Sequence, residues 1–185
     1  MSAFYLTFVA TLLAGFGARD QLTVAGLSLR QGRRPAVLVV AMVITVVTAA
    51  AAAYLATIML AQLPPPARTL FAALALGIAG LESLVLAPRN SPREPTNSLG
   101  ALMLVLLARQ AMDAARFLVF GMGVGMAGPW AAGAAGALAG FVLMLFAWRR
   151  PELLSSPVVP RVRRLAGALL LVATVALFLQ EFALV

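Results

Sequence analysis

The apolar residues of this chain fall into six long blocks, separated by short polar connectors rich in proline. The blocks cover about 4–29, 35–61, 67–87, 98–126, 129–148 and 162–184. A bilayer core of about 30 Å is crossed by roughly 20 apolar residues in helical form, so each block is long enough to span it. Proline in a connector cannot continue the preceding helix, which sets the boundaries between blocks. The pattern predicts an all-α membrane protein with six transmembrane helices.

Composition supports the same class. The chain has 185 residues, of which 63% are hydrophobic, and its mean hydropathy is +1.00. Soluble domains have roughly 45–50% apolar residues. The six blocks leave no room for a second, soluble domain. We therefore expect residues 1–185 to form a single membrane domain embedded in the lipid bilayer, which is its main partner.

The basic residues predict the orientation. All 14 are arginine, which suggests a GC-rich bacterial genome. With six spans, the connectors between helices one and two, three and four, and five and six share one side. That side holds ten arginines, and the other side holds only Arg68. The ten are Arg30, Arg33, Arg34, Arg89, Arg93, Arg149, Arg150, Arg161, Arg163 and Arg164.

Cytoplasmic connectors of membrane proteins carry an excess of arginine and lysine. We therefore expect a multi-pass protein of the bacterial inner (plasma) membrane with both termini extracytoplasmic. The net charge of +8 then reflects topology, and no nucleic-acid partner is expected. No basic residue precedes Arg19, so the first block is expected to be a span instead of a cleaved signal peptide.

Some chemistry is excluded by the residue types present. The chain has no cysteine and no histidine, which rules out disulfides, thiolate metal sites and imidazole ligands. It also lacks the common hydrolase and metalloprotease motifs. We expect no enzymatic activity and no cofactor.

The two halves of the chain resemble each other at an offset of 95 residues. Pro65 maps on Pro160, and GFGARDQL (15–22) maps on QAMDAARF (110–117). Three helices in each half require the halves to have opposite orientations. The sequence thus predicts two inverted three-helix repeats, 1–88 and 97–185, whose first helices, one and four, are interrupted by polar residues. Paired interrupted helices in inverted repeats indicate the midplane site of a transporter.

Eight polar residues within the spans form the predicted transport pathway between helices one and four. They are Arg19, Asp20, Gln21, Glu82, Arg109, Gln110, Asp113 and Arg116. A charged residue costs about 2.5–3.5 kcal/mol at the bilayer centre on insertion scales, so these charges must be paired or hydrated. From their similar depth we expect Glu82 to pair with Arg19. The alternative is that the charges are salt bridges which only hold the bundle together.

The layout and the segment GFGARDQL followed by QGRRP resemble the GDT-type family. These are Golgi and bacterial manganese/calcium cation–proton antiporters of the lysine-exporter superfamily, with six spans in two inverted halves. Each half opens with the motif E-x-G-D-[KR]-[ST]-Q. Gly15 and Ala18 occupy the two acidic positions in the first half, and Gln110 and Asp113 occupy them in the second. The resemblance implies that Asp113 and Gln110 would be the metal ligands.

Together these features favour a secondary transporter or exporter of small cations, exchanging manganese or calcium for protons, with its site between helices one and four. A homodimer is possible. Two alternatives stay open. The chain could be an exporter of a different small solute, such as an anion held by arginine. It could also be a transport-inactive family member that acts as a structural or interaction partner.

Overall fold

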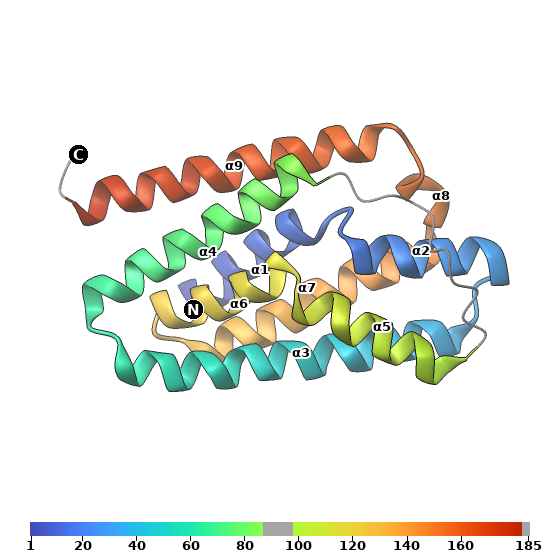
Figure 1. Ribbon diagram of the computed structural model, residues 1–185, viewed down its shortest axis with the longest axis horizontal. Helices are drawn as coiled ribbons and strands as arrows, with labels where there is room; N and C mark the ends of the chain where they lie inside the picture. Colours follow the sequence, from blue (N-terminus) through green and yellow to red (C-terminus); the bar gives the residue numbers. More distant parts are fainter. Residues whose placement is uncertain (87–97, 183–185) are drawn as a thin grey trace.

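The computed structural model describes residues 1–86 and 98–182, and all regular structure in these ranges is α-helical. The helices run along a single elongated bundle (Figure 1). In chain order they are α1 (Ser2–Gly15), α2 (Arg19–Gln31), α3 (Pro35–Gln62), α4 (Pro65–Val85), α5 (Leu99–Ala111), α6 (Ala114–Gly125), α7 (Pro129–Arg149), α8 (Pro151–Leu154) and α9 (Val158–Glu181).

The helices follow the predicted blocks, with two of the blocks broken. Four helices of the described chain, α3, α4, α7 and α9, are long and apolar enough to cross a membrane. The pair α1 and α2 forms a fifth span if counted as one, and it is bent by 59° at its break. α5 and α6 are apolar helices too short to cross alone. The interruptions predicted in the first and fourth blocks are therefore present.

Local sequence explains most boundaries. α3, α4 and α7 begin with proline, which fits the first turn because its missing N–H has no helical partner there. Gly32 ends α2 with a φ of +75°, in the left-handed region where glycine carries no steric penalty. The short helix α8 was not predicted.

The connectors gather at the two ends of the bundle. Figure 1 shows the α2–α3 and α7–α8 junctions at one end, and both termini with the α3–α4 and α6–α7 junctions at the other. Exposed arginines mark the first end, which we call the arginine-rich end: Arg30, Arg33, Arg34, Arg149, Arg150, Arg161 and Arg164. Arg89 and Arg93 lie outside the described residues.

Small residues allow the helices to approach closely. α4 packs along α6 and α9, and α3 packs along α7. A Cβ on Gly80 of α4 would lie 2.9 Å from the backbone oxygen of Gly167 in α9. A Cβ on Gly140 of α7 would lie 2.4 Å from the Thr45 Cγ2 of α3. Such contacts between small residues are typical of packed transmembrane helices.

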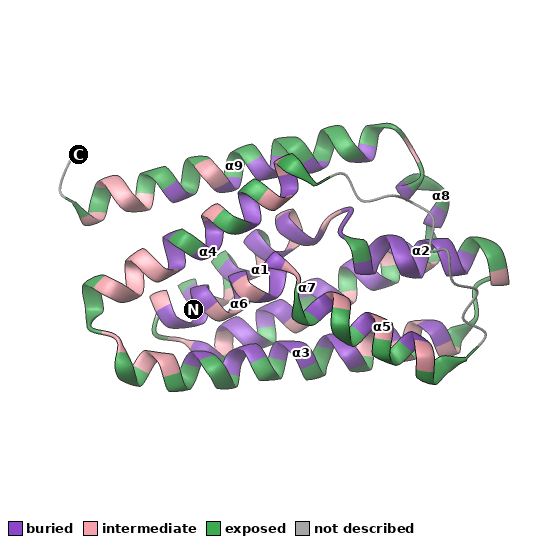
Figure 2. Ribbon diagram, viewed as in Figure 1, coloured by how far each residue is buried: buried purple, intermediate pink, exposed green. Residues whose placement is uncertain are grey.

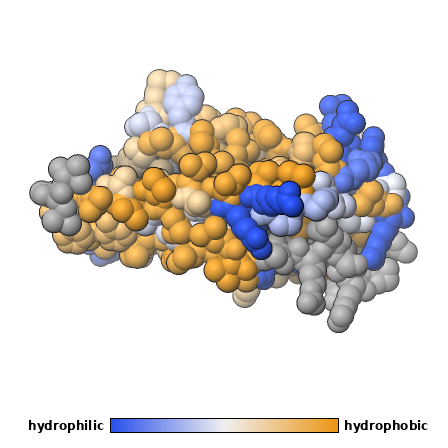
Figure 3. Space-filling view, turned by 90° about the horizontal axis from the view of Figure 1, so that it is seen from above, coloured by the Kyte–Doolittle hydropathy of each residue, from blue (hydrophilic) through white to orange (hydrophobic). Residues whose placement is uncertain are grey.

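The surface is apolar along the length of the bundle. Large apolar side chains such as Val39, Leu165 and Val172 are exposed, whereas α6 lies largely inside (Figure 2). In Figure 3 the hydrophilic atoms gather mainly at one end, and apolar side chains cover most of the remaining face. An exposed apolar band of this extent is what a protein surrounded by lipid presents.

Candidate functional site

Both interrupted helices break near the middle of the bundle (Figure 1). α1 ends at Gly15, and α2 begins at Arg19 after a turn through Gly17, whose φ is +68°. α5 ends at Ala111, and α6 begins at Ala114. A helix end leaves backbone N–H or C=O groups without helical partners, and an N-terminal end carries partial positive charge. The two breaks therefore place polar backbone groups inside an apolar bundle.

One ion pair connects the two breaks. Glu82 of α4 accepts a hydrogen bond through Oε2 from the N–H of Ala114, the first residue of α6, at 3.2 Å. Its Oε1 lies 3.5 Å from Nη2 of Arg163 in α9. The Nη1 of Arg163 donates to the carbonyl oxygen of Phe16, just after α1, at 3.4 Å. Glu82 and Arg163 thus each satisfy one backbone group that a break leaves open.

The prediction that Glu82 pairs with Arg19 is wrong, because the partner of Glu82 is Arg163. Arg19 is exposed. Arg163 was counted with the connector arginines because it lies at the very start of the last span, which was expected to begin at 162. α9 begins at Val158, one turn earlier, and this brings the Arg163 side chain into the bundle with only 3% exposed. No signal in the sequence separates Arg163 from its exposed neighbour Arg164.

A second contact joins the interrupted helices directly. Arg109, in the last turn of α5, donates from Nη1 to the carbonyl oxygen of Arg19 at 3.2 Å and also to the Thr23 hydroxyl. Arg19 and Thr23 both belong to the first turns of α2. The structure therefore brings Arg19 and Arg109 together, through the backbone of Arg19.

Gln110 and Arg116 are buried in the core between α3 and α7. The Gln110 Oε1 accepts from the Thr48 hydroxyl at 2.9 Å, and its Nε2 donates to Thr45 Oγ1 at 3.2 Å. Arg116 donates from Nη1 to the Gly136 carbonyl at 3.2 Å and from Nη2 to Gln110 Oε1 at 3.5 Å. The two threonines were missed, although hydroxyls in a strongly apolar helix indicate contacts between helices.

Gln21 and Asp20 lie in the first turn of α2. The Gln21 Oε1 accepts from the Gly17 N–H at 2.6 Å, and its Nε2 donates to the Leu143 carbonyl of α7 at 3.0 Å. The buried Asp20 carboxylate accepts from the Gln21 N–H at 2.7 Å. Gln21 therefore fixes the turn of the first break against α7.

Asp113 is the one predicted pathway carboxylate without a direct partner in the described chain. It is the N-cap residue of α6, but its side chain makes no capping hydrogen bond there; the N–H of Ala114 donates to Glu82. It is partly buried and lies within electrostatic range of Asp20, Glu82, Arg116 and Arg163.

The described residues contain no group of three or more His, Cys, Asp or Glu side chains that could hold a metal ion. A hard divalent cation needs several oxygen ligands. The Gln110 oxygen already accepts bonds from Thr48 and Arg116. The metal site of Asp113 and Gln110 therefore stays a prediction from the resemblance.

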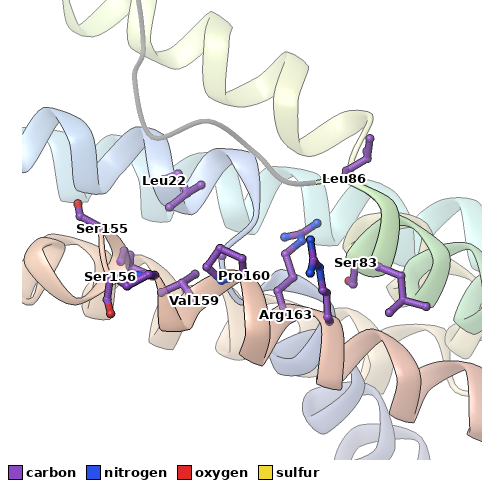
Figure 4. A pocket seen from close by; sticks show the side chains of 13 residues that line it. Leu22, Ser83, Leu86, Ser155, Ser156, Val159, Pro160 and Arg163 are labelled. Carbon is purple, nitrogen blue, oxygen red and sulfur yellow. The ribbon is translucent and has the colours of Figure 1, made fainter.

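A pocket of about 620 Å³ lies beside the ion pair, towards the arginine-rich end (Figure 4). It extends from Ser155 and Ser156, in the connector before α9, to Ser83 and Arg163 at the level of the breaks. Its described lining contains two arginines, three serines and no acidic residue. The lining residues are Gly17, Leu22, Ser83, Leu84, Leu86, Leu154, Ser155, Ser156, Pro157, Val159, Pro160, Arg163 and Arg164.

Comparison with known proteins does not assign this chain to a family. No family model matches this sequence. A search of curated proteins and a search of solved structures likewise returned no match. Any functional conclusion must therefore come from the site itself.

Proposed function

We propose that this chain is a secondary transporter of the bacterial plasma membrane that works by alternating access, and not an enzyme. One observation carries the proposal. The Glu82–Arg163 pair joins two helix breaks in the middle of an apolar bundle, beside a pocket that reaches them from one end. Interrupted helices of this kind form the substrate and ion sites of many transporters.

We further propose six spans in two inverted halves, with α1–α2 and α5–α6 each counted as one span. Equivalent contacts support this symmetry. Gly15 of α1 faces Leu143 of α7, since a Cβ on it would lie 2.6 Å from the Leu143 Cδ1. Gln110, which lies 95 positions after Gly15, bonds to Thr48, which lies 95 positions before Leu143. The arginine-rich end would then be cytoplasmic, and both termini would lie on the other side.

The coupling ion in this proposal is carried by Asp113. Its carboxylate has no direct partner among the described residues and lies near two other carboxylates, Asp20 and Glu82. A proton needs one such carboxylate, whereas manganese or calcium needs several oxygen ligands. The geometry therefore favours a proton over the divalent cation that the resemblance to the GDT-type antiporters implies.

A second candidate function is that of a non-transporting structural or interaction partner, for example within a homodimer. Its support is that Gln21, Gln110 and Arg116 are engaged in direct buried contacts. Such contacts would hold the helices of the bundle together without any substrate. The two candidates differ in whether ion flux occurs and whether it depends on Asp113.

The test is ion flux in proteoliposomes that contain a pH-sensitive dye. Gradients of manganese chloride, calcium chloride, sodium phosphate and sodium succinate are imposed in separate runs. We expect at least one gradient to change the internal pH, and Asp113→Asn to abolish the change. Asp113 has no ion-pair partner within the described chain. The free energy of unfolding of the Asp113→Asn variant should therefore differ from that of the wild type by less than about 1 kcal/mol.

Glu152→Gln is the matched control, since Glu152 is an exposed carboxylate that pairs with Arg33 at the arginine-rich end. It should leave the flux unchanged. If none of the four gradients moves protons in the wild-type protein, the non-transporting alternative is correct.

A further inference from the structure

Two buried hydrogen-bond donors that line the pocket have no acceptor among the residues that the structure describes. They are the Nε–H of Arg163 and the hydroxyl of Ser83. Both side chains are at most 3% exposed. Buried donors in native proteins are almost always paired, so two unpaired donors on one pocket wall call for an explanation. The simplest explanation is a ligand that supplies the acceptor.

The Arg163 guanidinium has capacity for such a ligand. Its contacts with Glu82 and with the Phe16 carbonyl are 3.5 and 3.4 Å long. A tight charge-assisted hydrogen bond of this type is about 2.7–2.9 Å long. Arg163 is therefore held loosely by its present partners, and its Nε edge has none.

The charge of the pocket favours an anion. Arg163 and Arg164 both line it, and its described lining includes no acidic side chain. Glu82 contacts Arg163 from outside this lining. In Figure 4 Arg163 projects from α9 and Ser83 from α4, so the two donors reach the pocket from different helices. A guanidinium and a hydroxyl together suit an oxygen acceptor that carries negative charge.

We propose that this pocket binds a small oxyanion, a carboxylate or an inorganic phosphate, through the Arg163 Nε–H and the Ser83 hydroxyl. The exposed Arg164, which also lines the pocket, adds electrostatic attraction. That the bound anion is also the transported solute rests on the proposed function, whereas the binding of the anion does not. Because Arg163 also holds the two helix breaks together through Glu82 and Phe16, an anion on its Nε edge acts on the element that the transport cycle must move.

The test is binding to the full chain in detergent micelles, measured by isothermal titration and by the shift in melting temperature. The probes are sodium succinate, sodium acetate and sodium phosphate, with sodium chloride holding ionic strength constant and choline chloride as a cationic control. Succinate or acetate binding without phosphate binding identifies a carboxylate site, and the reverse identifies a phosphate site.

Two variants and two matched controls locate the site. Ser83→Ala should weaken binding about tenfold, the usual effect of losing one hydrogen bond to a charged group. It should leave stability unchanged or higher, because it removes a hydroxyl that has no partner in the structure. Arg164→Gln should weaken binding and reduce its dependence on salt. Ser28→Ala and Arg161→Gln, at positions outside the pocket lining, should bind as the wild type does.

Arg163→Gln is made together with Glu82→Gln, so that no buried charge is left unpaired, and this double variant should lose binding entirely. The proposal is overturned if none of the oxyanions binds, or if Ser83→Ala and Arg164→Gln bind as tightly as their controls. Anion binding without flux in proteoliposomes would uphold the site and refute transport. Proton flux without anion binding would uphold transport and refute the anion site.

Discussion

At the residue scale, the composition of the site was predictable, but the pairing within it was not. The sequence marks Glu82, Asp113 and Arg116 because charged residues are costly inside apolar spans. It does not mark Arg163, which looks like one more connector arginine until the start of α9 is known. Which arginine meets Glu82 depends on the register between α4 and α9, and that register comes from the close approach of Gly80 and Gly167. No local pattern encodes it.

The Glu82–Arg163 pair makes a stability prediction. Glu82→Gln leaves the guanidinium of the nearly buried Arg163 without its countercharge and weakens the cap on α6. Breaking a buried ion pair by removing one partner costs about 3–5 kcal/mol. We expect a loss of this size in reversible unfolding by sodium dodecyl sulfate.

Replacing both partners removes both buried charges. The double variant Glu82→Gln and Arg163→Gln should therefore be more stable than Glu82→Gln alone. Glu152→Gln, at the exposed pair with Arg33, should change the unfolding free energy by at most about 1 kcal/mol. Equal losses in the single and double variants would show that the pair is not coupled.

At the element scale, helix ends were predicted better than helix partners. Pro35, Pro65 and Pro129 each begin a helix, because proline restricts the backbone locally and needs no tertiary context. Polar residues were expected to interrupt the first span, but Arg19, Asp20 and Gln21 are helical and the break falls at residues 16–18, with Gly17 in the left-handed region. Gln21, after the break, accepts a hydrogen bond from the backbone N–H of Gly17. Gly17 itself makes the turn.

Gly17 and Gly32 form a matched pair that tests the break. Both have a positive φ, +68° and +75°, and alanine in that region costs about 1–2 kcal/mol. Gly32 has nothing within 4 Å of an added Cβ, whereas at Gly17 the Cβ would lie 2.9 Å from the Val159 Cγ1.

Gly32→Ala should therefore show only the backbone strain. Gly17→Ala should lose about 1–3 kcal/mol more, the usual cost of overpacking, and should reduce any flux. Unfolding of the two variants in parallel measures the difference. Identical losses would mean that the turn at Gly17 adapts without disturbing α9.

At the scale of the whole molecule, buried polar atoms without a partner among the described residues lie on both sides of the first break, but only those on one side belong to residues that line the pocket. Towards the arginine-rich end, the buried Ser83 hydroxyl borders an open pocket. In α1, on the other side of the first break, the hydroxyls of Thr7 and Thr11 are also buried and unpaired, but neither residue lines that pocket. The pocket therefore reaches the breaks from the arginine-rich end, and the two threonine hydroxyls on the other side lie outside its lining. Access to the breaks from one side is what one state of an alternating-access transporter requires.

The chain has no native cysteine, so single cysteines can report both the topology and this asymmetry. Ser83→Cys should react with a small, membrane-impermeant thiol reagent added on the side of the arginine-rich end, and not from the other side. Thr11→Cys should be unreactive in the described state, since Thr11 is as buried as Ser83 but, unlike Ser83, does not line the pocket through which the reagent would arrive. When the second state is populated by the gradient that drives flux, Thr11→Cys should become reactive from the opposite side while the reactivity of Ser83→Cys falls. Thr48→Cys, at a buried position that bonds to Gln110, controls for general loosening and should stay unreactive throughout. If the reactivities of Ser83→Cys and Thr11→Cys rise together, or if Thr11→Cys never reacts, the bundle does not alternate between two openings and the stapled, non-transporting alternative holds.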